Sequence, residues 1–262
     1  MNNITGIITT LNEEKNIKDC IISLQMICDE IIVVDSLSSD HTTQIAAEMG
    51  AKVYSQRYLG DGLQKNVGLQ YAKNKWIFNL DADERITKEL ADEINAINLD
   101  ATPFDAFAVK RKNFIGSRWI TCCHWYPDYL VRLFNKEKTK FAEVKQHAFV
   151  ESKKFYKLNG DILHFTYKNI GEMFAKQSQR FSNRSAKIIY QSGKKVNVFS
   201  PIVHCFSSFC SNYFFRGGIL GGIDGFSISL SMAVNSYLKY ARVLEYKRDK
   251  KVFDEEDFNS VW

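Results

Sequence analysis

Apolar runs alternate with amphipathic helix patterns through the first hundred residues, and this alternation restricts the fold more than any other feature. Residues 4–10 (ITGIITT) and 30–36 (EIIVVDS) are typical of strands, and the second contains a continuous apolar run of the kind found in a parallel strand covered on both faces. Between them, Ile17, Cys20, Ile21 and Leu24 recur at helical spacing. Further strand patterns follow at 51–56 and 76–80. Repeated strand-helix units predict an α/β protein with a doubly wound, mostly parallel sheet flanked by helices.

The helices between these strands have recognisable ends. Ser39 or Asp40 is expected to cap a helix that stops at Gly50, and Thr87 is expected to begin another. The spacing places three apolar residues of the intervening helix on one face: Leu63, Val67 and Tyr71.

Acidic and hydroxyl side chains follow three of the predicted strands. They occur in TTLNEE at 9–14, in DSLSSD at 35–40 and in DADE at 81–84. Ligands of such sheets bind outside the carboxyl ends of the strands, where these loops converge. Carboxylates gathered there repel one another unless a cation or hydrogen-bond donors offset their charge. We therefore expect positive or hydrogen-bonding groups between the loops.

Two of these acids predict a metal site. The spacing of Asp81 and Asp83 puts both carboxylates on the same side of an extended segment, where they could hold Mg²⁺ or Mn²⁺. Such an ion completes its coordination with substrate phosphates and water, which indicates a nucleotide diphosphate. The chain lacks the glycine-rich dinucleotide fingerprint and GxxxxGK[ST], so neither a Rossmann dehydrogenase nor a P-loop NTPase is favoured.

Composition narrows the class of partner. The chain has 262 residues, 45% of them hydrophobic, and a net charge of +5, which is mildly basic and not typical of nucleic-acid binding. Lys and Arg concentrate at 136–195 and 247–251, which suits a phosphate-rich partner, an anionic membrane surface or an ordinary solvated face. The six cysteines lack CxxC spacing and follow no export signal, which favours reduced thiols in a cytosol; partial metal ligation by Cys122-Cys123-His124 is the alternative.

Three stretches of the sequence together resemble a known family. ITTLNEEKNI, IIVVDSLSSDHT and GLQKNVGLQYAKNKWIFNLDADE resemble, in order and spacing, the donor-binding half of family 2 glycosyltransferases, which have the GT-A fold. WYPDYLVRLFNK, GDILHFTY and FFRGGILGGIDGF resemble the bacterial subgroup that adds glucose or a related hexose to the lipopolysaccharide inner core. The resemblance implies a metal-dependent, inverting enzyme that uses a UDP-sugar.

The resemblance also implies roles for individual residues of the donor site. Thr9, Leu11 and Glu13 would line the nucleotide pocket, and Asp35 would accept the N3–H of uracil. Lys65 would face the diphosphate. Asp81 would contact the ribose or a metal-bound water, and Asp83 would ligate the metal. For several of them a structural role is the alternative: Thr9 ending a strand, Asp35 capping a turn and Lys65 lying on a helix surface.

The general base is where the sequence departs from its apparent relatives. Many of them have His-Glu where this chain has His147-Ala148, so a carboxylate is missing there. Asp128, after Trp-Tyr-Pro, is the favoured base, with Glu151 and Glu143 as the other candidates. His147 is expected to orient or bind the acceptor.

The carboxyl-terminal third is predicted to be helical. We expect a catalytic domain over 1–165, with a donor half at 1–100 and an acceptor half at 101–165, and a helical region over 166–262. Residues 196–215 contain no formal charge, yet they include too many Ser, Asn and His residues for a simple membrane span. Helices with one apolar face at a bilayer surface, or helices packed into a core, fit better.

These observations lead to one expected function and two alternatives. We expect a cytoplasmic enzyme, peripheral at the inner face of the inner membrane, that transfers a hexose to an inner-core heptose of lipopolysaccharide. The acceptor would be a glycolipid or oligosaccharide, and no nucleic acid would be bound. Transfer to a polyprenyl phosphate or a capsule precursor is one alternative. A non-catalytic protein that binds a sugar nucleotide is the other.

Overall fold

The computed structural model describes residues 2–144 and 148–253, which fall into two compact units. Unit 1 comprises Met1–Lys112 and Pro127–His164, and unit 2 comprises Asn113–Tyr126 and Phe165–Trp262. Predicted His147 lies outside the described residues.

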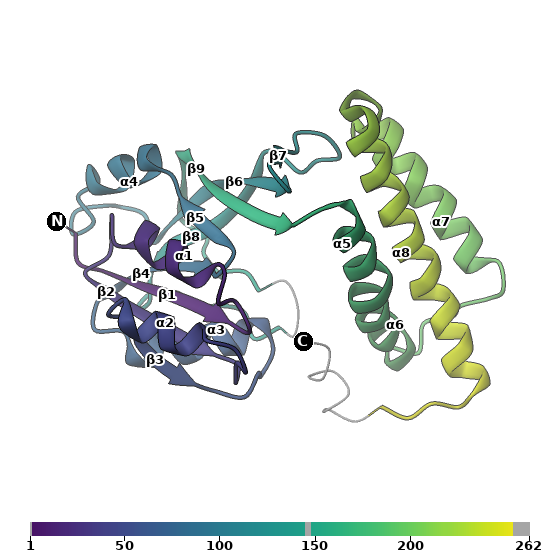
Figure 1. Cartoon of the computed structure of the whole chain (residues 1–262), viewed down its shortest axis with the longest axis horizontal. Coiled ribbons are helices and arrows are strands. Elements are labelled where there is room, and N and C mark those ends of the chain that lie inside the picture. The colour runs from purple at the N-terminus through teal and green to yellow at the C-terminus, as the bar shows by residue number, and fades with distance from the viewer. Residues whose placement is uncertain (1, 145–147, 254–262) are drawn as a thin grey trace. The chain divides into compact units, whose positions relative to one another are not determined.

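The first four long strands form the parallel part of the sheet, in the order β3-β2-β1-β4 (Figure 1). Their bounds are β1 Ile4–Thr10, β2 Glu30–Asp35, β3 Lys52–Ser55 and β4 Trp76–Asp81. They match the predicted strands closely because each is a short apolar run that is almost fully buried, apart from β3 at the end of the series. The predicted α/β class is confirmed.

Alternate residues of these strands face helices on opposite sides of the sheet. Ile4, Ile8 and Val33 pack in a core with α1 (Ile17–Leu24), α2 (Thr42–Glu48) and α4 (Lys88–Asn95). Ile7 and Val34 pack in a second core with α3 (Asp61–Tyr71). The period of two along a strand therefore explains both layers.

The predicted cap of α4 is present, whereas the N-cap position of α2 is His41, which makes no side-chain cap hydrogen bond, so the predicted capping residues Ser39 and Asp40 lie just outside that helix. The side chain of Thr87 accepts a hydrogen bond from the backbone N–H of Leu90, as expected for the start of α4. The Asp40 carboxylate accepts from the backbone N–H of Thr42 at 3.0 Å, at the start of α2. Gly50, which follows α2, has a φ of +81°, a conformation that glycine adopts without strain.

Helix α3 buries an unexpected face. Leu63 and Tyr71 share a face with Val67, yet both are exposed. The buried positions are Gly62, Gln64, Lys65 and Gly68. A Cβ on Gly68 would lie 2.7 Å from Ile7 Cγ2, so only glycine lets α3 approach β1 this closely. This close packing carries Lys65 into the interior, which rules out a surface position for it.

The remaining strands extend the sheet in antiparallel pairings. Beyond β4 the order continues β8-β6-β9-β5, and β7 pairs with β6. Their bounds are β5 Glu84–Ile86, β6 Ala106–Ile115, β7 Arg118–Trp119, β8 Asp128–Asn135 and β9 Phe155–Tyr167. Strand β8 lies between β4 and β6, so its side chains are brought next to the acidic end of β4.

Unit 2 is built from helices and the segment 113–126. Helices α5 (Ile170–Ala175) and α6 (Ser182–Gln191) are joined by a π-helical stretch, Lys176–Phe181. Helices α7 (Ser200–Cys210) and α8 (Gly222–Arg248) follow. A core holds the unit together through these residues: Ile115, Ile120, Cys123, Tyr167, Met173 and Ile228.

Membrane-span criteria give a mixed result for this unit. No single helix of the described residues is long and apolar enough to cross a bilayer. Ser200–Phe215 and Gly218–Arg248 meet the criteria only as a pair, and a 70° bend separates them.

Candidate active site

The first two acidic loops are tied together by hydrogen bonds at the carboxyl ends of β1 and β2. The backbone N–H of Asn12 donates to Ser38 Oγ at 2.8 Å, and the Asn12 side chain accepts from the N–H of Ser39 at 2.8 Å. The N–H of Glu13 donates to Thr42 Oγ1 at 2.8 Å. Donor groups thus lie between the loops, as the sequence predicted.

Asp35 ends β2 and is buried. Its carboxylate accepts the Ser38 N–H at 2.8 Å and the Ser38 hydroxyl at 2.5 Å, so it holds the first turn of its own loop. The turn-capping role expected as the alternative is therefore present. On the neighbouring strand β1, Thr9 is in register with Val34 of β2 and with Asp81 of β4, and Leu11 follows the end of β1.

Asp81 stands at the centre of a charged cluster in unit 1. Lys65 Nζ donates to Asp81 Oδ1 at 2.8 Å, and Arg132 Nη2 donates to Asp81 Oδ2 at 3.1 Å. Burial alone would raise the pKa of Asp81, but Lys65 and Arg132 hold it well below the usual range. Asp81 is therefore ionised at neutral pH.

Glu84 connects this pair to a second arginine. Its side chain is fully buried and accepts from Arg132 Nη2 at 2.5 Å and from Arg111 Nη1 at 3.2 Å. It also accepts the backbone N–H of Asp81 at 3.0 Å. Arg111 then donates through Nε and Nη2 to one oxygen of Asp128, Oδ2, at 3.0 and 2.7 Å.

The cluster is balanced in charge within the described part of the chain. Three carboxylates alternate with three cations, so the protein itself supplies the positive groups that the acidic loops require: Asp81, Glu84 and Asp128 with Lys65, Arg111 and Arg132. Burial lowers the pKa of Arg132, but Glu84 and Asp81 raise it further, so the net pKa is raised. Buried ion pairs of this kind need every partner in place.

Asp83 points to a different neighbour. Its Oδ2 lies 3.4 Å from His164 Nε2 on β9, and both side chains are partly exposed. The chain turns at residues 82–83 instead of continuing extended, so the premise that placed Asp81 and Asp83 on one side of a strand was wrong. The carboxylate of Asp83 thus faces His164, while both oxygens of Asp81 bond to cations.

The residues of the site permit only a partly protein-bound metal. No group of three or more His, Cys, Asp and Glu side chains in residues 2–144 and 148–253 is arranged to hold an ion. Asp83 and His164 offer one carboxylate and one imidazole, while both oxygens of Asp81 already bond to cations. Two protein ligands are what Mg²⁺ or Mn²⁺ uses when phosphates and water complete its coordination.

The remaining candidate bases lie elsewhere. Glu151 is exposed. Its backbone N–H donates to the Lys140 carbonyl, and its backbone carbonyl accepts from the Thr139 hydroxyl. Among the described residues, no ion pair joins Glu151 to the cluster. Glu143 pairs with Lys140 at the surface.

The sequence reasoning missed three members of the site. Arg132 interrupts the apolar run of YLVRLF, and a charge inside a buried strand requires a buried partner of opposite sign. The sequence therefore indicates a buried partner for Arg132. Arg111 lies between two lysines, in KRK, and nothing in that stretch indicates that it has a buried partner. His164 was part of a recognised motif, and only the pairing of β5 with β9 reveals its place opposite Glu84 and near Asp83.

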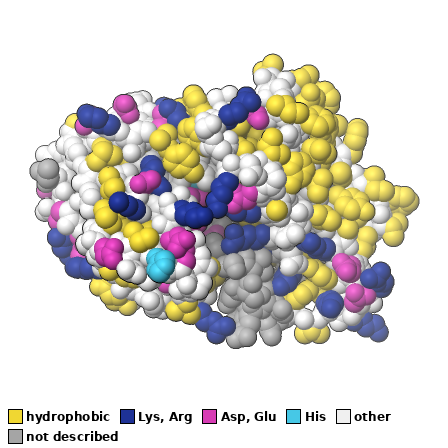
Figure 2. Space-filling view, in the orientation of Figure 1, with side chains coloured by type: hydrophobic (Ala, Val, Ile, Leu, Met, Phe, Trp, Pro, Cys, Tyr) yellow, Lys and Arg dark blue, Asp and Glu magenta, His cyan; other side chains and the backbone are white. Residues whose placement is uncertain are grey.

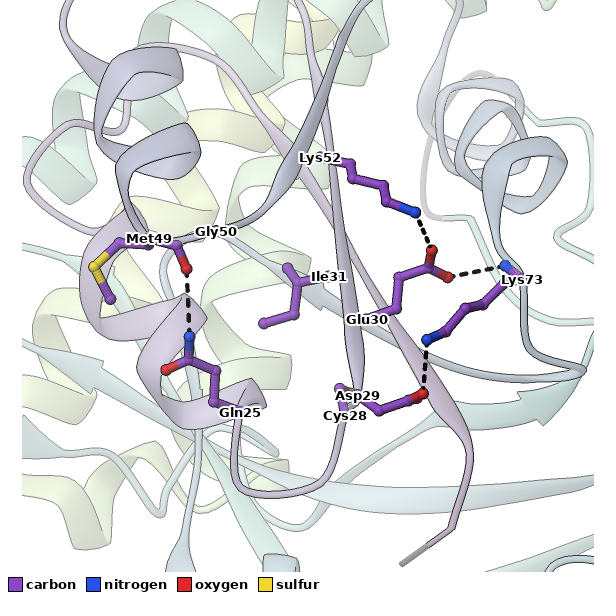
Figure 3. Close-up of a pocket in the computed structure, with 9 residues that line it drawn as sticks. All are labelled: Gln25, Cys28, Asp29, Glu30, Ile31, Met49, Gly50, Lys52 and Lys73. Carbon is purple, nitrogen blue, oxygen red and sulfur yellow. Dashed lines mark hydrogen bonds and ion pairs between the residues drawn. The ribbon is translucent and has the colours of Figure 1, made fainter.

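A hollow lies at the amino ends of β2 and β3, the ends opposite those that bear the acidic loops (Figure 3). There Glu30 accepts from Lys52 Nζ at 2.8 Å, from the backbone N–H of Lys73 at 2.9 Å and from Thr5 Oγ1 at 2.7 Å. Asp29 pairs with the side chain of Lys73. The carboxylates of Glu30 and Asp29 are paired with lysines, so we assign this hollow a structural role and not a binding role.

Comparison with known proteins defines the class. Residues 5–162 match glycosyl transferase family 2, which is more than half of the chain. The chain therefore belongs to glycosyl transferase family 2. The crystal structure of TarS residues 1–349 from S. aureus superposes with a TM-score of 0.50 at 16% identity, over 97% of this chain and 93% of that one. This likeness confirms the GT-A fold.

Individual relatives match over most of their length. A protein of Rickettsia bellii (strain RML369-C) described as an uncharacterized glycosyltransferase is 33% identical over 254 residues, covering 92% of this chain and 86% of its own. LpsC of Rhizobium meliloti (strain 1021), described as a lipopolysaccharide core biosynthesis glycosyltransferase, is 26% identical over 92% of both chains.

Proposed function

We propose that this glycosyltransferase transfers a hexose, with glucose as the first candidate, from a UDP-sugar to an inner-core heptose of lipopolysaccharide. The similarity to LpsC, whose description names lipopolysaccharide core biosynthesis, supports the acceptor class. TarS residues 1–349 have also been crystallised with UDP, which supports a uridine nucleotide as the donor. The charged cluster around Asp81 is the observation that carries the proposal, because it lies at the carboxyl ends of the parallel strands, where sheets of this kind bind ligands.

The proposed reaction is a single displacement with inversion. An acceptor hydroxyl oxygen forms a bond to C1 of the sugar, and the bond from C1 to the diphosphate oxygen breaks. The electron pair of that bond leaves with UDP, and the hydroxyl proton passes to a base. Negative charge therefore grows on the diphosphate during the step, and a positive group close to it lowers the barrier.

Lys65 is the proposed partner of the departing diphosphate. In the absence of a ligand it bonds to Asp81, and its ammonium lies 5.6 Å from the centre of the Phe141 ring. Arg132 also bonds to Asp81, so Asp81 keeps a cationic partner when Lys65 turns toward a phosphate. A phosphate oxygen can thus replace one Asp81 oxygen without leaving a buried charge unpaired.

Asp83 and His164 are the proposed protein ligands of Mg²⁺ or Mn²⁺. When bound, the ion would act as a Lewis acid that stabilises charge on the diphosphate. Asp83 Oδ2 and His164 Nε2, two atoms that can each ligate a metal ion, lie 3.4 Å apart. Asp81 would contribute through water or the ribose, because its own oxygens bond to Lys65 and Arg132.

Asp128 is the proposed general base. Both hydrogen bonds from Arg111 go to Oδ2, and within the described residues no hydrogen bond is made by Oδ1. Arg111 fixes the carboxylate through its two hydrogen bonds to Oδ2. The Asp128 side chain is partly exposed, and Oδ1 is proposed to take the proton. Thr9, Leu11, Glu13 and Asp35 are proposed to line the nucleotide pocket, with His147 and Glu151 on the acceptor side.

A release assay tests the proposal. UDP-glucose and UDP-galactose are each incubated with the enzyme, Mn²⁺ and a lipid-free heptose-containing core saccharide, and UDP is measured. Release that depends on the saccharide, and is faster with UDP-glucose, supports the proposal. Release only with a polyprenyl phosphate favours that alternative acceptor. Donor binding by calorimetry without acceptor-dependent release favours a non-catalytic sugar-nucleotide-binding protein.

A further inference from the structure

Unit 2 exposes large apolar side chains on α7 and on the turn, Gly218–Gly221, that leads into α8. Phe206 is 72% exposed and Leu220 is 88% exposed, values far above those of the core. Figure 2 shows hydrophobic side chains gathered over these helices. We name as the apolar patch the residues that define this surface: Phe199, Ile202, Val203, Phe206, Leu220 and Ile223.

The spacing of four patch residues shows that they lie on one face of a helix and are not isolated exposed side chains. Phe199, Ile202, Val203 and Phe206 follow the i, i+3, i+4, i+7 pattern that normally turns toward a core. Here those side chains are all more than half exposed, while Pro201 of the same helix is buried. Contiguous apolar surface of this kind on a folded protein usually marks a binding face.

Basic groups lie beside the patch. His204, on α7 between patch residues, stacks on the ring of Tyr240 with the centroids 4.0 Å apart. Lys239 Nζ lies 5.0 Å and Lys194 Nζ 6.0 Å from the centre of the same ring. Burial and the neighbouring Lys194 lower the pKa of Lys239. In the described part of the chain, neither lysine takes part in an ion pair.

This combination of charge and apolarity identifies one kind of occupant. We propose that the apolar patch docks on the surface of a bilayer that contains anionic lipid, with Lys194 and Lys239 at the level of the lipid phosphates. Apolar side chains then enter the acyl boundary while the lysines gain the anionic partner they lack in the protein. A second copy of the chain fits less well, because its own lysines would add like charge. The inference does not depend on the proposed donor or acceptor.

Vesicle sedimentation of the full chain tests the proposal. Vesicles of phosphatidylcholine alone are compared with vesicles that also contain phosphatidylglycerol, and the partition coefficient is measured at two salt concentrations. We expect binding to the anionic vesicles that weakens in high salt. The double variant Phe199→Ser, Phe206→Ser should lower the partition coefficient at least about tenfold. Val252→Ser, which changes a side chain 90% exposed outside the patch, should not.

A second pair of variants tests the lysines. Lys194→Gln with Lys239→Gln should lower binding to anionic vesicles about tenfold and leave weak binding to phosphatidylcholine unchanged. Lys153→Gln with Lys154→Gln, two exposed positions of unit 1, is the matched control. Unchanged thermal unfolding of each variant shows that the fold is intact. No binding to either vesicle, or a patch whose loss only abolishes self-association in sedimentation velocity, would overturn the proposal.

Discussion

The ammonium of Lys65 on α3 lies 2.8 Å from a carboxylate oxygen of Asp81 at the end of β4, and the lysine is almost fully buried. We predict that Lys65→Met lowers acceptor-dependent UDP release at least about a hundredfold, because the growing charge on the diphosphate loses its partner. The release assay measures this. Lys73→Met, which removes a surface ion pair with Asp29, is the control and should leave the rate unchanged. Equal rates for both variants would remove Lys65 from the mechanism.

Glu84→Gln is predicted to lower the free energy of unfolding by about 3–5 kcal/mol. Arg132 keeps Asp81 and Arg111 keeps Asp128, but the substitution leaves three cations of the cluster with two carboxylates, and an uncompensated buried charge is costly. Urea denaturation followed by circular dichroism measures the change. Glu89→Gln, on the exposed side of α4, is the control. A loss of stability no larger than that of the control would show that Asp81 and Asp128 compensate the two arginines without Glu84.

The parallel half of the fold was predictable because local pattern and tertiary environment agree there. Strands β1, β2 and β4 are apolar runs that are buried on both faces, so hydrophobicity alone located them. Helix α3 shows the limit of that reasoning. Its buried face contains Gly68 and Lys65, and no local rule indicates that a lysine is carried inward by glycine packing against Ile7.

The candidate site likewise contains residues that could be predicted from the sequence and residues that could not. Asp81 could be identified because an acid ends a buried strand, and the expectation of positive groups beside it was met by Lys65 and Arg132. The pairing of Asp83 with His164 could not be foreseen, because it depends on a strand about eighty residues away. Distant antiparallel pairings such as β5 with β9 leave no periodic signal of their own in either segment.

Asp83→Asn and His164→Gln are each predicted to weaken UDP binding in the presence of Mn²⁺ at least about tenfold, which is about 1.4 kcal/mol. Each variant loses one of the two proposed metal ligands, and binding measured without metal should change much less. Calorimetry with and without Mn²⁺ separates the two effects. Asp92→Asn, in a surface pair with Lys88, is the control. Metal-independent losses would assign these side chains to direct nucleotide contact.

Asp128→Asn is predicted to lower kcat by about 10²- to 10⁴-fold while the KM for the donor stays nearly constant. An amide keeps much of the shape of the carboxylate but cannot accept the hydroxyl proton. Steady-state kinetics over a range of donor concentrations provides both constants. Glu151→Gln tests the competing assignment in the same assay. If that variant loses turnover and Asp128→Asn retains it, Glu151 is the base and the assignment to Asp128 is wrong.

Glu30 is predicted to make stability depend on acid pH. Burial alone would raise the pKa of Glu30, but hydrogen bonds from Lys52, from the backbone of Lys73 and from Thr5 lower it. Figure 3 shows the bonds from Lys52 and Lys73. An unfolded glutamate titrates near about 4.3, so the stabilisation is complete above that pH and is lost as pH falls through the lower folded-state pKa. Glu30→Gln should cost about 1–3 kcal/mol at pH 7 and less at pH 3.

Thermal unfolding of the Glu30 variant at the two pH values measures this difference. Glu48→Gln, at an exposed position of α2, should show the same small change at both. A Glu30→Gln penalty that is equal at pH 7 and pH 3 would mean that the glutamate contributes through shape and not through its charge.

Unit 2 takes its residues from two separate stretches of the chain, and this restricts how the gene can be divided. Ile120 and Cys123 come from the first stretch and pack with Met173 and Ile228 from the second. A truncation after residue 164 would remove Met173 and Ile228, and the apolar side chains of Ile120 and Cys123 would then be exposed to water. Chimaeras that exchange unit 2 between relatives therefore need to carry residues 113–126 together with all residues from 165 onward.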